Sequence, residues 1–217
     1  MPNTLSPLRY PGGKKQLYNF VLNTLEKNDI SGTYIEPFSG GAAIAIELLL
    51  KNHVSRIVIN DLDPSIHAVW DAVINDSEHL IAKINAVPFD YQKYSTEDSK
   101  KLIEFWKAIK NKHELVKEDP NSLDNAFTTL MLNRMNVSGI ISGGPIGGKK
   151  QNGLYRLNSR FNKMTLITKI KAISDRSDDI DLFNLDANNL VEVIKASPSY
   201  VPNNTFIFFD PPYYVQG

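Results

Sequence analysis

The sequence predicts an α/β protein with a parallel β-sheet that is interrupted by a long helical and basic insertion. Two short apolar segments, "YIE" and "RIVIN", are separated by a glycine-rich loop and an apolar helical segment. A strand, a loop, a helix and a second strand form a βαβ unit, which implies parallel strands with a right-handed crossover. Two further apolar segments near the end, "IDLF" and "TFIFF", extend the same pattern.

The first elements follow from hydrophobic periodicity. Residues 15–27 predict an amphipathic helix, since the spacing of their apolar side chains fits one helical face. A strand is expected at 33–36, a small-residue loop after it and a helix through Leu50, followed by a strand in "RIVINDLDP". The acidic residues at the end of this second strand mark the edge of the sheet where ligands bind in α/β proteins.

The middle of the chain predicts helices rather than strands. Apolar residues recur at helical spacing from Ser65 to about Arg134, and a glycine-rich basic segment follows that we expect as an exposed hairpin or loop. "MTLITKIKAIS" predicts another helix, and a helix near 187–196 joins the third and fourth strands. We therefore expect a discontinuous catalytic domain, 1–64 and 165–217, and an insertion domain, 65–164.

Composition excludes several classes. The chain has no cysteine, which rules out disulfides and thiolate chemistry, and no apolar run of the roughly 18 residues that a membrane span needs. The N-terminus has no apolar signal segment. The four histidines lack metal-ligand spacing, so no metal site is expected.

The charge is distributed unevenly. The 217 residues have 24 basic and 24 acidic side chains, yet the segment from Arg134 to Lys171 contains eight basic residues and no Asp or Glu. The rest of the chain therefore has a net charge of −8, from 24 − 8 = 16 basic and 24 acidic residues. Such a local excess indicates a phosphate-binding surface, although a solvated face with counter-charges elsewhere in the fold is the alternative.

A nucleotide-like ligand is predicted at the first two strand ends. "EPFSGG" allows close approach of a ligand to the backbone, with donors from the following helix, although such turns also exist for tight packing alone. Asp61 follows the next strand, where a carboxylate can accept hydrogen bonds from ribose hydroxyls; Asp63 could instead cap the next helix. The spacing leaves dinucleotides, nucleotides and S-adenosylmethionine open.

The segment "FFDPPYY" predicts a site for an exocyclic amine. Two prolines after a strand make a rigid turn, which can aim the Asp210 carboxylate and the Pro211 carbonyl at one point. Two acceptors would hold both amine hydrogens, and Tyr213 could stack on the ring that bears the amine. A proline-rich turn after an edge strand is the purely structural alternative.

Four ordered motifs, "LRYPGGKKQ", "YIEPFSGGAAI", "INDLD" and "FFDPPYY", resemble the adenine-N6 DNA methyltransferases of the Dam type. The resemblance implies a Rossmann-like, S-adenosylmethionine-dependent methyltransferase sheet and methyl transfer to adenine in double-stranded DNA, in a restriction system. The catalytic residues that it implies are Asp210, Pro211, Pro212 and Tyr213. The cofactor contacts that it implies are Tyr10, where relatives have Trp, and Lys14, Phe38, Gly40, Asp61 and Asp210. Asp186, after the third strand, could support the pocket or cap the next helix.

The basic insertion lies where the family has its target-recognition segment. Residues 143–149 fit G-x-x-x-x-G-K, but Lys150 stands where a P-loop needs Ser or Thr and no strand precedes the motif, so an NTPase is disfavoured. As a flexible hairpin the insertion suits DNA. Its predicted phosphate contacts are Lys149, Lys150, Arg156 and Arg160, and its candidate base-reading residues are Asn133, Arg134, Asn136 and Gln151.

Further expectations follow from the resemblance. Four strands are fewer than the family's sheet contains, so the sheet is expected to be C-terminally truncated, with self-association through its open edge or with a missing C-terminal half. An inactive remnant that binds DNA or cofactor is then the alternative function. Methylation of protein amides is a second alternative, which Asp at 210 and the basic insertion disfavour. The resemblance implies a cytoplasmic protein encoded by a bacterium or phage.

Overall fold

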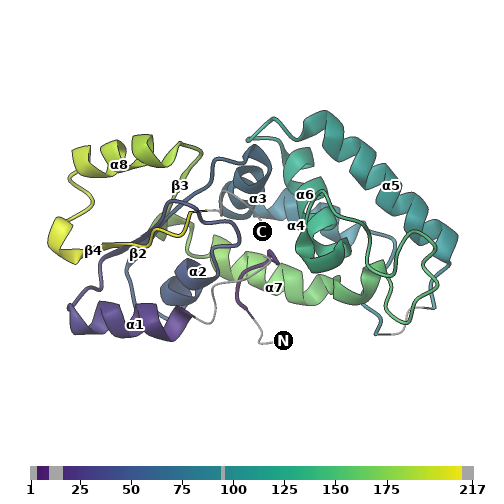
Figure 1. Cartoon of the computed structure of the whole chain (residues 1–217), viewed down its shortest axis with the longest axis horizontal. Helices are drawn as coiled ribbons and strands as arrows, with labels where there is room; N and C mark the ends of the chain where they lie inside the picture. The colour runs from purple at the N-terminus through teal and green to yellow at the C-terminus, as the bar shows by residue number, and fades with distance from the viewer. Residues whose placement is uncertain (1–3, 10–16, 94–95, 212–217) are drawn as a thin grey trace. The chain divides into compact units, whose positions relative to one another are not determined.

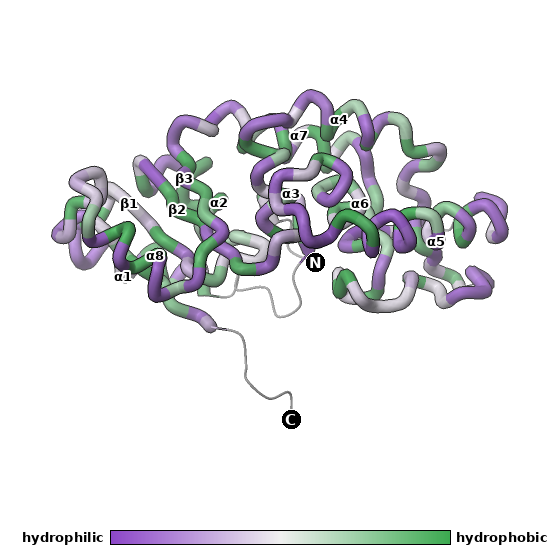
Figure 2. Tube along the Cα trace, turned by 90° about the horizontal axis from the view of Figure 1, so that it is seen from above, coloured by the Kyte–Doolittle hydropathy of each residue, from purple (hydrophilic) through white to green (hydrophobic). Residues whose placement is uncertain are grey.

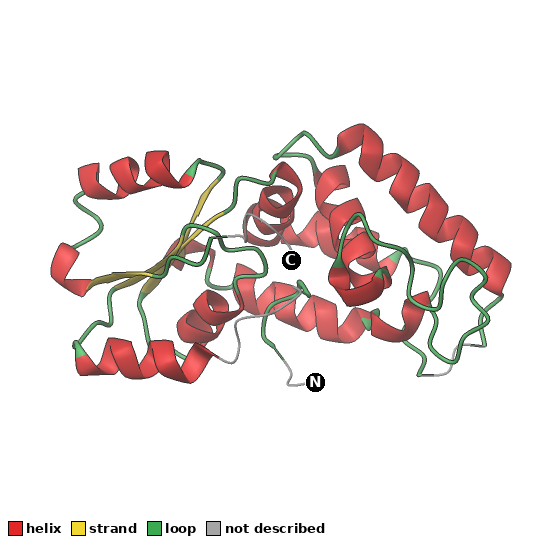
Figure 3. Ribbon diagram, in the orientation of Figure 1, coloured by secondary structure: helices red, strands yellow, loops and turns green. Residues whose placement is uncertain are grey.

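The computed structural model describes residues 4–9, 17–93 and 96–211 (Figure 1). The described chain divides into two compact units. Unit 1 contains residues 4–6, 17–63 and 176–211, and unit 2 contains residues 7–9, 64–93 and 96–175. All strands of the described chain belong to unit 1, whereas unit 2 consists of helices and loops (Figure 3).

Unit 1 is a four-stranded parallel sheet covered by helices. Its elements in chain order are α1 (Tyr18–Lys27), β1 (Thr33–Glu36), α2 (Ala43–Leu50), β2 (Arg56–Asn60), β3 (Ile180–Phe183), α8 (Ala187–Ala196) and β4 (Thr205–Ile207). The strand order is β3-β2-β1-β4, and every neighbouring pair is parallel. The prediction of a parallel α/β sheet is confirmed, and the bounds predicted for β1 and α8 coincide with the observed ones.

The two faces of the sheet bury alternate residues of each strand. Helix α8 lies on one face and α1 and α2 lie on the other (Figure 1). Ile35 and Val58 pack with Leu190 and Ile194 of α8 in one apolar cluster. On neighbouring strands Tyr34 stacks on Phe206, with ring centroids 6.0 Å apart. The central strands β1 and β2 are buried almost throughout, whereas most residues of the edge strands β3 and β4 are half-buried. The apolar centre of β2 is visible in Figure 2, as expected for a strand with both faces covered.

Unit 2 is a helical bundle with one long loop. Its helices are α3 (Pro64–Asn75), α4 (Ser77–Asn85), α5 (Ser99–Val116), α6 (Leu123–Met135) and α7 (Lys163–Ser174). Helix α6 packs on α3, α4 and α5, and it is buried along most of its length. Helix α5 alternates between hydrophilic and hydrophobic residues, as expected for a helix with one buried face (Figure 2).

Helix α7 belongs to unit 2, whereas the predicted boundary at 164/165 would put it with the sheet. Its buried residues Leu166, Ile170 and Ile173 share one helical face. That face belongs to a helix that packs on α3 and α4, and the unit therefore ends at Asp175. None of the described helices is both long and apolar enough to cross a membrane.

Candidate functional site

The candidate site of unit 1 lies where the strand order reverses. The chain runs from β1 outward to β2 and β3, and then returns to place β4 on the other side of β1. In open α/β sheets, ligands bind beyond the carboxyl ends of the strands at such a switch point. The glycine-rich loop that follows β1 and the segment that follows β4 therefore flank the expected binding position.

Asn60 holds the ends of three strand segments together. Its buried side chain donates from Nδ2 to the carbonyls of Pro37 and Leu185, each at 2.9 Å, and its Oδ1 accepts from the Leu185 N–H at 2.9 Å. The Asn60 carbonyl also accepts from the Ser39 N–H at 2.9 Å. Asn60 is not among the predicted site residues, although a polar amide at the end of an apolar strand is the signal that could have identified it.

The glycine-rich loop has a left-handed backbone at two positions. Gly40 has φ of 47° and Ala42 has φ of 43°. Glycine adopts this conformation without strain, whereas it is costly for alanine. The Ala42 N–H donates to the Ser39 carbonyl at 2.7 Å, and helix α2 begins at the next residue. The loop therefore makes a tight turn at the edge of the sheet, in which the N–H groups of Ser39, Gly40 and Ala42 are bonded within unit 1.

Asp61 connects this loop to the end of β2. Its Oδ2 accepts from the Gly40 N–H at 2.8 Å, and its Oδ1 accepts from the Asp63 N–H at 3.0 Å. Asn184 donates to the Asp61 carbonyl at 2.7 Å. Each carboxylate oxygen can accept more than one hydrogen bond, so the half-buried Asp61 can shape both loops and still bind hydroxyl groups.

Asp210 follows β4 by three residues. Ile35 pairs with Ile207 on the neighbouring strand β1, and the negative charge of Asp210 acts on the Tyr34 hydroxyl of that strand. The Phe208 N–H donates to the Ile35 carbonyl at 2.9 Å, which carries the pairing past the last strand residue. The structure thus brings four of the predicted site residues, Phe38, Gly40, Asp61 and Asp210, to one edge of unit 1.

The electrostatics of this edge are acidic. Burial, together with the negative charges of Glu36 and Asp210, raises the pKa of the Tyr34 hydroxyl well above its ordinary value. The neutral Tyr34 hydroxyl donates to Glu36 Oε1 at 3.1 Å, and the Ala45 N–H donates to the same oxygen at 3.3 Å. The edge therefore suits a ligand that is cationic or rich in hydrogen-bond donors.

The remaining predicted residues of unit 1 lie at the start of α8, at the end of the described chain, or outside the described residues. Asp186 caps α8, since its Oδ1 accepts from the Asn188 N–H at 2.9 Å, which is the helix-cap alternative. Pro211 is exposed at the end of the described chain. Four predicted residues lie outside the described residues: Tyr10, Lys14, Pro212 and Tyr213.

Two of the residues predicted to read bases, Asn133 and Asn136, are buried in unit 2. The Asn133 amide donates to the carbonyls of Arg9 and Gly139 and accepts from the Arg9 N–H. Asn136 donates to the carbonyls of Ile140 and Ile141, and it accepts from Trp106 Nε1 at 2.8 Å. Because these amide groups are used inside the protein, the structure contradicts their assignment as base-reading residues.

Gln151 is a third buried amide with the same role. Its Nε2 donates to the carbonyls of Ile146 and Gly148 at 2.8 and 2.6 Å, and its Oε1 accepts from the Leu157 N–H. The segment after α6 is therefore a compact succession of turns whose backbone is held by buried amides. The expected flexible hairpin is replaced by a shaped loop, in which one isolated bridge joins Asn136 to Pro145.

The side chain of Arg134 is also bonded within the protein. Its guanidinium donates to the carbonyls of Arg160 and Pro7. Burial, and then the charges of Arg9 and Arg160, lowers the pKa of Arg134 to about 10. The group thus uses its donors on backbone carbonyls, and its assignment as a base-reading residue is not supported.

The predicted phosphate-binding residues are more accessible. Lys149, Lys150 and Arg160 are exposed, whereas Arg156 is half-buried and donates to the Glu97 carbonyl at 2.7 Å. The exposed cations of this segment are therefore accessible to an anionic molecule that binds to unit 2.

Comparison with known proteins agrees with this arrangement. A family model described as D12 class N6 adenine-specific DNA methyltransferase matches residues 10–216. Among curated proteins, the Type II methyltransferase M.MjaIII of Methanocaldococcus jannaschii is 26% identical over 215 residues, which cover 95% of this chain and 68% of that protein. The Modification methylase StsI of Streptococcus sanguinis is 25% identical over 214 residues, which cover 97% of this chain and 29% of that protein.

The family match covers nearly the whole chain and includes both units. The reaction class of this family needs a methyl donor and acts on DNA. The chain belongs to the D12 class of N6 adenine-specific DNA methyltransferases.

Proposed function

We propose that the chain transfers a methyl group from S-adenosylmethionine to N6 of an adenine in a defined sequence of duplex DNA, as the modification activity of a restriction-modification system. The observation that carries the proposal is the position of Asp210 and Pro211 after β4, the strand that lies beside β1 at the switch point of the sheet. The family match favours this enzyme over the inactive remnant.

The residues at this edge fit S-adenosylmethionine. Ser39 Oγ is buried in the glycine-rich loop and has no hydrogen-bond partner among the described residues, so it offers a polar group to a bound ligand. Asp61 can accept hydrogen bonds from ribose hydroxyls, and Phe38 is half-buried at the same edge. The acidic surroundings favour a ligand that carries a positive sulfonium charge.

In the proposed reaction the protein positions adenine rather than activating it by proton transfer. The target base must leave the DNA stack, which costs a few kcal/mol. Asp210 and the Pro211 carbonyl would accept hydrogen bonds from the two N6 hydrogens, which leaves the nitrogen lone pair directed at the methyl group. The bound cofactor supplies an electrophilic methyl carbon. As the N6–carbon bond forms, the bond between that carbon and the sulfonium sulfur would break, its electron pair would return to sulfur and S-adenosylhomocysteine would remain as the leaving group. One amine proton then leaves toward the acceptors or water, and holding this geometry supplies most of the acceleration.

Unit 2 would bind the DNA around the target base. Lys149, Lys150 and Arg160 are exposed in a segment that lacks acidic residues, which suits contacts to phosphates. With Asn133, Asn136 and Gln151 used internally, sequence recognition must rely on other groups of the unit. The self-association expected through the sheet edge stays a prediction, which sedimentation at several concentrations would test.

The experiment measures tritiated methyl transfer to duplex DNA and identifies the product base. Wild type should form N6-methyladenine, and Asp210→Ala should reduce the rate by about a hundredfold or more, since one preorganised polar contact contributes on that scale. Asp186→Asn is the matched control, because it removes a carboxylate that caps α8 after β3 and Asn is an equally good cap.

The two variants separate the proposal from its alternatives. Equal rates for wild type and Asp210→Ala would contradict the assigned role of Asp210. If wild type labels protein amides instead of DNA, the substrate class is wrong. A thermal shift with S-adenosylmethionine and no transfer to any DNA would support the inactive binding protein.

A further inference from the structure

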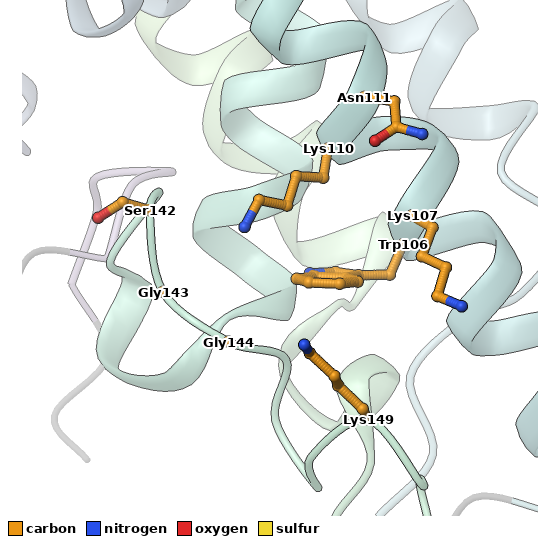
Figure 4. A pocket seen from close by; sticks show the side chains of 8 residues that line it. All are labelled: Trp106, Lys107, Lys110, Asn111, Ser142, Gly143, Gly144 and Lys149. Atoms are coloured by element: carbon orange, nitrogen blue, oxygen red, sulfur yellow. The ribbon is translucent and has the colours of Figure 1, made fainter.

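A basic pocket in unit 2 lies between α5 and the loop that follows α6 (Figure 4). The cavity has a volume of about 570 Å³. Its lining residues come from two segments of the chain: Trp106, Lys107, Lys110 and Asn111 from α5, and Ser142, Gly143, Gly144 and Lys149 from the loop. The predicted DNA contacts include none of the four residues from α5.

Three lysines and no carboxylate line this pocket. In Figure 4 the side chains of Lys110 and Lys149 approach Trp106 from opposite sides, while Lys107 extends along the rim. Within the described chain none of the three lysines has a carboxylate at ion-pair distance. Glu114, one turn beyond Lys110, acts on it electrostatically but is paired with Lys117 at 2.8 Å. The pocket therefore has an excess of positive charge that a bound anion would balance.

Trp106 forms part of the wall and is not a platform for a base. The residue is only 4% exposed, and Lys110 Nζ lies 5.4 Å from the ring centroid. Because a lysine covers the ring face, an unstacked base could not stack on it without displacing that contact. The chemistry of the pocket therefore suits phosphate oxygens better than an aromatic ligand.

The loop side of the pocket is already shaped. Asn136 connects Trp106 to the carbonyls of Ile140 and Ile141, so the floor and the loop are joined by one buried amide. The Val137 N–H donates to the Gly144 carbonyl at 3.0 Å, and the Ile146 N–H donates to the Met135 carbonyl at 2.9 Å. A preorganised loop loses little conformational entropy when it binds a ligand.

Neither steric crowding nor backbone conformation requires a glycine at position 144. A Cβ added there would meet no atom within 4 Å, and its φ lies outside the left-handed range. In contrast, Gly147 has φ of 82°, and an added Cβ would lie 2.5 Å from the Tyr155 carbonyl oxygen. The missing side chain at 144 leaves the backbone beside the pocket open to close approach.

From this geometry we propose that the pocket binds a phosphodiester of the DNA backbone, with Lys110 and Lys149 as its principal cations. The inference rests on the proposed function only in that the bound polymer is DNA. It also accounts for the glycine-lysine motif at 143–149, which resembles a P-loop in sequence. Since phosphates carry no base identity, the pocket would contribute affinity and orientation rather than sequence specificity.

The experiment measures the salt dependence of binding to a labelled duplex by fluorescence anisotropy, between about 0.05 and 0.5 M salt. Lys110→Gln and Lys149→Gln should each lower the slope of log K against log salt by about 0.9, the contribution of one phosphate contact. If wild type and variant bind equally at about 1 M salt, this difference in slope makes the variant bind about eightfold more weakly at 0.1 M salt. Lys101→Gln is the matched control, because Lys101 is exposed on the same helix but does not line the pocket.

The controls distinguish this inference from the proposed reaction. If the slopes of Lys110→Gln and Lys149→Gln equal that of Lys101→Gln, the pocket does not bind a phosphate, and the inference is overturned even if wild type methylates DNA. An acidic protein segment as the true partner would give the same unchanged slopes. Reduced slopes support the inference even if wild type transfers no methyl group. Gly144→Ala should also weaken binding while the thermal unfolding temperature stays within about 2 °C of wild type.

Discussion

Asn60→Ala is expected to loosen the candidate site from within the sheet. The substitution removes three hydrogen bonds of 2.9 Å, to the Pro37 carbonyl and to the carbonyl and N–H of Leu185, at a residue that is 1% exposed. At about 1 kcal/mol net for each bond, the free energy of unfolding of unit 1 should fall by about 3 kcal/mol. That loss corresponds to an opening equilibrium about a hundredfold more favourable.

Asn184→Ala is the matched control. It removes an asparagine from the neighbouring loop whose amide donates one hydrogen bond, to the Asp61 carbonyl at 2.7 Å, at a half-buried position. The expected loss is about 1 kcal/mol, or roughly a fivefold change in the opening equilibrium.

The assay is amide hydrogen exchange of peptides that cover β1 and β2, followed by mass spectrometry. Tryptophan fluorescence would not report on this unit, since both tryptophans, Trp70 and Trp106, lie in unit 2. Equal protection in Asn60→Ala and Asn184→Ala would refute the reasoning, because it would mean that the three bonds of Asn60 do not hold the strand ends together.

Three further outcomes test other parts of the fold. Burial, and then the hydrogen bond to Asp181 and the charge of Asp181, raises the pKa of Tyr200 from 10.0 to about 12. Wild type should therefore be more stable than Tyr200→Phe below pH 10, and this difference in the free energy of unfolding should disappear as the pH rises through 12. Urea denaturation at a series of alkaline pH values measures it. Asn136→Ala should lower the stability of unit 2 by about 3 kcal/mol in urea denaturation followed by tryptophan fluorescence, and an effect below 1 kcal/mol would contradict its structural role. Gly147→Ala should lower the thermal unfolding temperature more than Gly148→Ala, because an added Cβ clashes with a carbonyl only at 147.

The sheet could be predicted from sequence because its physical causes are local. The strands are rich in apolar residues, and a glycine-rich turn and an Asp-Pro turn follow the carboxyl ends of β1 and β4, at Gly40 and Asp210. The positions of Phe38, Gly40 and Asp61 after β1 and β2 followed from this pattern. The strand order, with β4 beside β1, required the structure, since it depends on contacts between segments far apart in the chain.

The polar residues of unit 2 could not be assigned in this way. Asn and Gln are found both at DNA interfaces and as buried links between backbone groups, and the two roles have the same local sequence. Asn136 and Gln151 are fully buried because the turns around them leave carbonyls that need donors. Helix α7 was assigned to the wrong unit for a related reason, because an apolar helical face does not reveal whether it packs on a sheet or on other helices.

The buried amides that hold the loop after α6 also separate two kinds of constraint on its sequence. Its shape depends on inward-facing residues such as Asn136 and Gln151, whereas outward-facing positions such as Asn152 and Tyr155 are exposed. Substitutions at the outward positions can therefore accumulate during evolution without refolding the loop. A methyltransferase lineage with such a loop could acquire a new DNA target sequence through surface changes alone, while the same scaffold is inherited.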